Sequence, residues 1–126
     1  MDCIERPFTV TVNGQTVTKA DENGEAQIHA SLGPEPAVFT LNQGRLECDD
    51  WYLGRSLVDD RSLLPKRVLW FKKDATGPSL IHSTTAVAAD GSYKLLLAGA
   101  PLTAHDNLLW ADLMQDNPPK IEISLQ

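Results

Sequence analysis

The sequence predicts an all-β fold, a single antiparallel β-barrel or β-sandwich of about ten short strands. Asparagine–glycine and aspartate–glycine turns interrupt stretches in which apolar and polar residues alternate, whereas helical periodicity is scarce. The length of 126 residues suits one domain, and no linker or low-complexity segment divides the chain. We therefore expect residues 1–126 to form one β domain.

The clearest element is a hairpin over Thr9–Thr18. β-Branched and polar residues alternate here on both sides of Asn13-Gly14. Asn-Gly supplies the positive φ angles of a type I′ turn, which joins two antiparallel strands through only two residues. This pattern predicts one strand on each side of the turn.

Two further hairpins follow the same logic, one over residues 37–48 with its turn at Gly44, the other over residues 85–99 with its turn at Asp90-Gly91. Three hairpins would also suit a β-trefoil, but the turn glycines are unevenly spaced, so the trefoil is kept as the alternative fold. Shorter apolar segments predict more strands: residues 26–30, 67–71, 79–84, 107–113 and 120–125. For residues 107–113 a short helix is the second interpretation.

The apolar run Val68-Leu69-Trp70-Phe71 is typical of a strand that is covered on both faces. Trp70 is therefore expected in the core rather than on a binding surface. With it we predict burial of six more side chains, spread over the second and third hairpins and residues 67–71 and 107–113: Phe39, Leu41, Val68, Leu95, Leu97 and Trp110.

The charge balance excludes several partners. The net charge of −6 argues against nucleic acid and against anionic membrane surfaces. No apolar run reaches the roughly 20 residues that a membrane-spanning helix needs. No signal peptide is visible, which leaves a cytoplasmic protein, or a secreted or cell-wall protein whose leader was removed. Cys3 and Cys48 allow either one disulfide or two free thiols, and a homodimer stays open beside a monomer.

Several short motifs between residues 37 and 113 follow one another in a characteristic order. These are Phe39-Thr40-Leu41 with Gly44, Val58-Asp59-Asp60-Arg61-Ser62, the strand at 67–71, Asp90-Gly91, Ala98-Gly99-Ala100, and Trp110. In this order the chain resembles fungal cell-wall proteins of the phialide-associated (PhiA) type. The resemblance implies a compact β fold and a cell-wall role, and it supplies no catalytic residues.

The stretch from Trp51 to Phe71 concentrates charged and aromatic residues. The simplest interpretation is structural, with arginines that pair with aspartates and pin a long connection. The functional interpretation is a polar ligand clamp, in which aromatic rings stack on a sugar and polar groups bind its hydroxyls. The candidate ligand-binding residues are Trp51, Tyr52, Arg55, Asp59, Asp60 and Arg61.

No residue is assigned a catalytic role. If the protein were an enzyme, the candidates would be Arg55, Asp59, Asp60 and Arg61, but adjacent residues of a strand point in opposite directions and make a poor acid–base pair. The three histidines lack the spacing of metal ligands, so neither a metal nor a cofactor is expected.

The function expected from these observations is non-enzymatic binding of a carbohydrate or similar small polar ligand, as in a fungal cell-wall or defence protein. One alternative is a small β-barrel that binds or cyclises a hydrophobic metabolite. The other is a protease inhibitor that presents a rigid loop, and two segments could form it: Gly33–Ala37 and Leu63–Arg67.

Overall fold

A computed structural model describes residues 3–19, 27–57, 65–73, 81–89, 92–112 and 120–126. These residues form thirteen strands and no helix. In chain order the strands are β1 (Ile4–Val12), β2 (Gln15–Thr16), β3 (Gln27–His29), β4 (Phe39–Asn42), β5 (Arg45–Cys48), β6 (Trp51–Gly54), β7 (Lys66–Arg67), β8 (Leu69–Lys72), β9 (Thr84–Ala89), β10 (Ser92–Leu97), β11 (Ala100–His105), β12 (Leu108–Ala111) and β13 (Ile121–Leu125). The predicted all-β class is confirmed.

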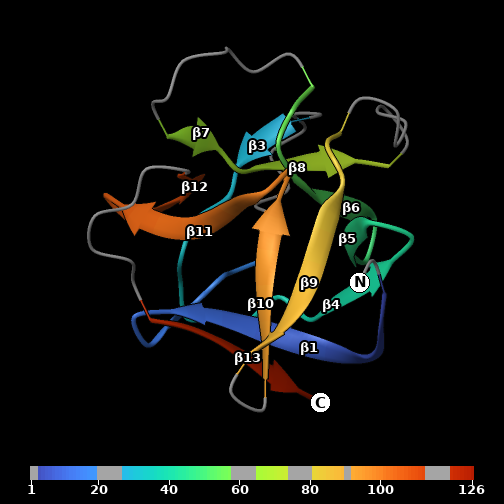
Figure 1. Ribbon diagram of the computed structural model, residues 1–126. Coiled ribbons are helices and arrows are strands. Elements are labelled where there is room, and N and C mark those ends of the chain that lie inside the picture. The colour runs from blue at the N-terminus through green and yellow to red at the C-terminus, as the bar shows by residue number, and fades with distance from the viewer. Residues whose placement is uncertain (1–2, 20–26, 58–64, 74–80, 90–91, 113–119) are drawn as a thin grey trace.

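The strands form two antiparallel sheets that share one core, in a sandwich-like arrangement rather than a closed barrel (Figure 1). The larger sheet has the order β13-β1-β4-β5-β6-β8-β3, and β2 pairs with β1. The smaller sheet has the order β7-β12-β11-β10-β9. In Figure 1, β9 and β10 run across the front of the molecule, and β1 and β13 lie at its base.

Tight hairpin turns connect many neighbouring strands. Asn13 and Gly14 have φ angles of 52° and 82°, as the type I′ turn requires, and β1 pairs with β2 through Thr11–Thr16 and Val12–Gln15. The same pair of positive φ angles recurs at Gln43-Gly44, Ala98-Gly99 and Asp106-Asn107. The first two predicted hairpins are confirmed, and β9 pairs with β10 around residues 90–91, which lie outside the described residues.

Gly14→Val should destabilise the protein by about 1–3 kcal/mol through backbone strain alone. An added Cβ at Gly14 would meet no atom within 4 Å, so side-chain packing contributes nothing to this loss. Urea unfolding of Gly14→Val beside Gly14→Asn would measure it, because asparagine tolerates positive φ far better than valine. Equal stability of the two variants would contradict the turn assignment.

The core between the sheets contains six of the seven side chains that we predicted to be buried. Phe39, Leu41, Val68, Trp70, Leu95 and Leu97 are each no more than 1% exposed. Trp70 lies on β8 with its ring stacked on that of Phe39, the centroids 5.6 Å apart and the planes 8° from parallel. On the other face of β8, Leu69 and Phe71 pack with Ile81 in a second, smaller cluster. The strand is thus covered on both faces, as its sequence indicates.

Trp110 is the exception, and its predicted place in the core is wrong. β12 alternates, with Leu109 and Ala111 buried at 0% and 1% exposure and Trp110 between them on the opposite face, where it is half-buried. Its large apolar ring indicated a core position, but the pleat of the strand sends its two neighbours inward instead.

Four further expectations can be compared with the structure. The strand interpretation of residues 107–113 is confirmed by β12. Of the strand expected over residues 79–84, residues 79 and 80 lie outside the described residues, Ile81 forms an isolated bridge with Ser56, and Thr84 begins β9. Cys3 and Cys48 are both free thiols. Among the described residues, no helix is long and apolar enough to cross a membrane.

Candidate functional site

The charged middle stretch divides between a strand and a connection. Trp51 and Tyr52 belong to β6, which lies between β5 and β8. Trp51 is only 5% exposed and Tyr52 is half-buried. Asp59, Asp60 and Arg61 lie outside the described residues. The assignment of the six residues to a ligand site therefore stays a prediction.

Arg55 comes directly after β6 and is buried, with 7% of its surface exposed. Its Nη1 donates a hydrogen bond of 3.0 Å to the carbonyl oxygen of Leu97, the last residue of β10. This contact ties the larger sheet to the smaller one. The Arg55 guanidinium is thus held inside the protein in a contact between the sheets. The pairing of arginines with Asp59 and Asp60 lies outside the described residues.

Two lysines at the end of β8 lie near the aromatic rings of β6. The Nζ of Lys72 is 6.0 Å from the ring centroid of Trp51, and that of Lys73 is 5.2 Å from the ring of Tyr52. Lys73 also forms a 2.7 Å ion pair with Glu47. Each β6 ring therefore already has a lysine of the same protein within cation–π distance, and Lys73 is also paired with Glu47.

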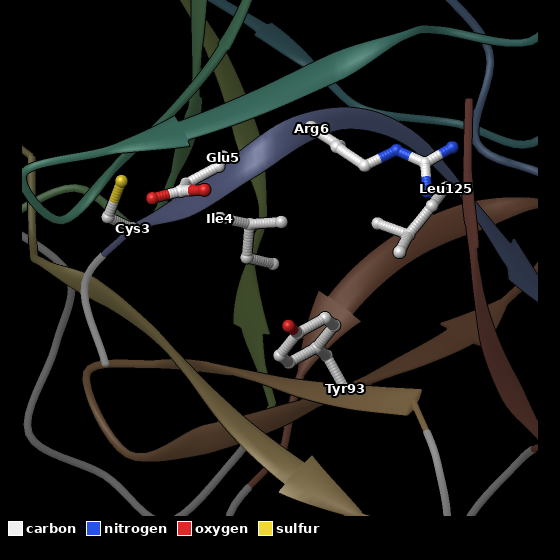
Figure 2. Close-up of a pocket in the computed structure, with 6 residues that line it drawn as sticks. All are labelled: Cys3, Ile4, Glu5, Arg6, Tyr93 and Leu125. Atoms are coloured by element: carbon white, nitrogen blue, oxygen red, sulfur yellow. The ribbon is translucent and has the colours of Figure 1, made fainter.

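Two surface depressions are lined by none of Trp51, Tyr52 and Arg55. Figure 2 shows one of about 350 Å³, in which Ile4 of β1 points toward the ring of Tyr93 on β10; it is lined by Cys3, Ile4, Glu5, Arg6, Tyr93 and Leu125. The other, of about 530 Å³, lies beside β11 and β12 and is lined by Pro65, Thr103, Ala104, His105, Trp110 and Asp112. Trp110 there meets His29 edge to face, with ring centroids 4.8 Å apart.

His29 fills the space behind Trp110. Its Nε2 is 2.8 Å from the carbonyl oxygen of Leu109, and burial lowers the pKa of its imidazole below the usual value. Burial also raises the pKa of the Cys48 thiol, which therefore holds its proton at neutral pH. Within the described segments, no three His, Cys, Asp or Glu side chains come close enough to share a metal ion.

The segment Gly33–Ala37 lies between β3 and β4, where Pro36 forms an isolated bridge with Thr18. Pro34, Glu35 and Pro36 are exposed, while Leu32 before them and Ala37 after them are buried at 5% and 0% exposure. The two prolines fix φ near −65°, and the two buried residues anchor both ends of the exposed tripeptide. This segment, called the Pro34–Pro36 loop below, is an exposed loop on a rigid base.

Hydrogen bonds hold the Pro34–Pro36 loop to two neighbouring segments. On the residue 16–19 side, the amides of Gly33 and Ala37 donate to the carbonyls of Thr16 and Val17, both at 3.0 Å. The carbonyl of Glu35 accepts bonds from that side as well, 2.7 Å from the Thr18 hydroxyl and 3.3 Å from the Lys19 amide.

The β11–β12 turn holds the other side of the loop base. Asn107 accepts from the amide of Leu32 at 3.0 Å through its backbone carbonyl, and its side-chain Nδ2 donates to the carbonyl of Leu32 at 3.1 Å. Asn107 thus satisfies both backbone groups of Leu32. Because Leu32 is itself buried, this contact fixes where the loop leaves the body of the protein.

A hollow of about 370 Å³ opens beside the loop, lined by Gly14, Gln15, Thr16, Leu32, Gly33, Pro34 and Asn107. Loop, hollow and the two adjoining hairpin turns therefore form one continuous surface. An exposed loop that is anchored at both ends and adjoins a hollow offers a partner protein both an element to bind and a surface to rest on.

The second candidate segment, Leu63–Arg67, has a different character where it is described. Lys66 and Arg67 form β7 at the edge of the smaller sheet, and both pair with β12. Lys66 is buried at 7% exposure, whereas Pro65 and Arg67 are exposed. Leu63 and Leu64 lie outside the described residues. The described half of this segment is thus a strand set in a sheet rather than a protruding loop.

Comparison with protein families gives a single assignment. The model of the peptidase inhibitor I66 family matches residues 37–124, more than two thirds of the chain. The chain belongs to the peptidase inhibitor I66 family. Comparison with curated proteins and with solved structures found no match.

Membership of the I66 family corrects the resemblance to PhiA-type proteins, and with it the fungal cell-wall and carbohydrate-binding assignments. The motifs behind that resemblance were too general to identify a family. A Phe-Thr-Leu strand before a glycine turn and an Asp-Gly turn between two strands are what any antiparallel sheet of short hairpins requires. They correctly indicated the fold and carried no information about the ligand.

Sequence reasoning found the Pro34–Pro36 loop through its prolines but missed the residues that support it in this I66 family member. Thr18 and Asn107 lie 17 and 75 positions from their partners in the loop region, Glu35 and Leu32. Only one local signal was available. The Asp106-Asn107 pair suits a turn with positive φ, which would have placed Asn107 at a surface turn but not beside the loop.

Proposed function

We propose that this protein inhibits a peptidase by inserting the Pro34–Pro36 loop into the cleft of its target. Membership of the peptidase inhibitor I66 family is the observation that carries the inhibitor function. It favours the inhibitor alternative over binding of a carbohydrate or a hydrophobic metabolite. The matched region, residues 37–124, begins directly after the Pro34–Pro36 loop, so the choice of this loop rests on its exposure and its anchored ends.

The loop has the properties that tight inhibition demands. A segment already held in its bound conformation loses little conformational entropy on binding, so more of the contact energy appears as affinity. Two prolines and anchors at both ends restrict the Pro34–Pro36 loop in this way. Each other hairpin turn described above consists of only two residues with positive φ, whereas three consecutive residues are exposed in this loop.

The surroundings of the loop supply additional contact area. Protease–inhibitor interfaces bury roughly 1,600 Å² in total, far more than three residues can cover. The Asn13-Gly14 and Asp106-Asn107 turns and the hollow between them and the loop adjoin Pro34. The rim of the partner's cleft would rest on this surface while the loop enters the cleft.

The first test of this proposal is a panel of serine, cysteine, aspartic and metallo-peptidases assayed with the full chain. Replacing both Pro34 and Pro36 by glycine should weaken inhibition about 3- to 30-fold, because each proline restricts the free loop by roughly 0.4–1 kcal/mol. Pro7→Gly is the matched control, since Pro7 is exposed on β1 outside the loop, and it should leave the inhibition constant unchanged.

Two outcomes would contradict the proposal in different ways. Failure of the unmodified chain to inhibit any peptidase class would overturn the function. Loss of inhibition in Arg67→Ala, with full inhibition in the proline double variant, would instead place the reactive segment at Leu63–Arg67, whose Arg67 is exposed.

A further inference from the structure

The tip of the Pro34–Pro36 loop contains a carboxylate beside a carbonyl that the protein itself holds. The Glu35 carbonyl oxygen is 2.7 Å from the Thr18 hydroxyl and 3.3 Å from the Lys19 amide, so it turns toward the body of the inhibitor. The residue is exposed nonetheless. The backbone carbonyl of Glu35 thus anchors the loop, whereas its side chain remains available to a partner.

The anchored carbonyl protects the bond that follows it. To cut between Glu35 and Pro36, a peptidase nucleophile must add to the Glu35 carbonyl carbon, and the Pro36 nitrogen must leave with a proton. The carbonyl oxygen would become an oxyanion that needs donors of the peptidase about 2.7–3.1 Å away. Here that oxygen already accepts two hydrogen bonds from Thr18 and Lys19, so it reaches the peptidase donors only if the loop detaches from its base.

The carboxylate is the only charged group in the segment from Gly33 to Val38. None of the residues that the structure describes forms an ion pair with it. The neighbouring exposed side chains are apolar, namely Pro34, Pro36 and Val38. A partner must therefore offer apolar contacts around one cation, because a carboxylate buried at an interface without a partner is strongly unfavourable.

From these observations, and resting on the proposed function, we infer that Glu35 selects a peptidase with an arginine or lysine in its cleft and that this peptidase holds the Glu35–Pro36 bond without cutting it. A charge-assisted hydrogen bond to Arg or Lys is roughly twice as strong as a neutral one. Thr18 acts as a positioning residue, since its hydroxyl holds the Glu35 carbonyl away from the peptidase's donors.

The test uses the full chain and the peptidase that it inhibits most strongly in the panel. Glu35→Gln should weaken inhibition by about 10-fold or more, and Glu35→Lys by about 100-fold or more, since like charges then meet. Glu5→Gln is the matched control: Glu5 is exposed beside the depression of Figure 2, and its loss of one negative charge should change inhibition less than about 2-fold. The melting temperature of all three variants should stay within a few degrees of the parent.

Thr18→Val tests the protection of the bond. Removing the hydroxyl leaves the Glu35 carbonyl with only its longer bond to the Lys19 amide and keeps the carboxylate in place, so initial inhibition should persist but the loop should be cut over hours. Mass spectrometry after long incubation should find the Glu35–Pro36 bond intact in the parent chain and cleaved in the variant.

Each outcome separates this inference from the proposed function. Inhibition by the parent chain that is unchanged in Glu35→Gln and Glu35→Lys would overturn the role of Glu35 and leave the inhibitor function standing. Rapid cleavage of the parent between Glu35 and Pro36, or an intact bond in Thr18→Val, would overturn the protection. Absence of inhibition by the parent chain against every peptidase class would overturn both.

Discussion

Trp70→Ala should lower the free energy of unfolding by about 3–5 kcal/mol, a loss typical of truncating a buried tryptophan. Trp70 is 1% exposed, and its ring stacks on Phe39, which in turn packs against Phe8 with ring centroids 6.1 Å apart. The truncation removes one end of this row of three rings and leaves a cavity that the flanking strands cannot close.

Trp110→Ala is the matched control for this loss. Trp110 is half-buried at the rim of a surface depression, so its removal opens space that water can fill, and the loss should stay below about 2 kcal/mol. Urea unfolding of both variants followed by circular dichroism would measure the difference. Equal losses would show that Trp70 and Trp110 are equally important to the core.

The contrast between the two tryptophans shows how far the sequence could predict the core. Val68-Leu69-Trp70-Phe71 has no polar position, so whichever face each side chain takes, it must be buried. The apolar segment Leu108–Ala111 could pair in either of two registers, which place opposite sets of side chains in the core. Only the pairing of β12 with β11 and β7 decides that Trp110 lies outside the core.

The hairpin turns were predictable for a similar reason. Asn13-Gly14 favours positive φ whatever surrounds it. Strand β6 was not predicted, because the arginines and aspartates that follow it indicated a connection over the whole stretch. The loop base could not be predicted at all, since Asn107 meets Leu32 only after both sheets have assembled. Local chemistry thus identifies turns and an exposed loop, while the rigidity of that loop comes from contacts distant in sequence.

Arg55 provides the sharpest test of the charged middle stretch. Its burial at 7% exposure and its bond to the Leu97 carbonyl predict a structural role. Arg55→Met removes the charge along with the hydrogen bond, keeps most of the apolar volume, and should cost about 1–3 kcal/mol. Arg55→Lys keeps the charge but lacks the planar guanidinium, so it leaves a poorly paired ammonium in the interior and should cost about 3–5 kcal/mol.

We expect Arg55→Lys to be less stable than Arg55→Met although it keeps the charge. This order of stabilities distinguishes a buried arginine that joins two sheets from a surface charge. Arg67 supplies the control because it is exposed on β7, and Arg67→Met should change stability by less than about 0.5 kcal/mol. Both Arg55 variants that still fold should inhibit the target peptidase as the parent does, since Arg55 bonds inside the protein to β10 and not to the Pro34–Pro36 loop. An Arg55→Lys protein as stable as the parent would show that the guanidinium does not join the two sheets, and would return Arg55 to the candidates for a ligand site.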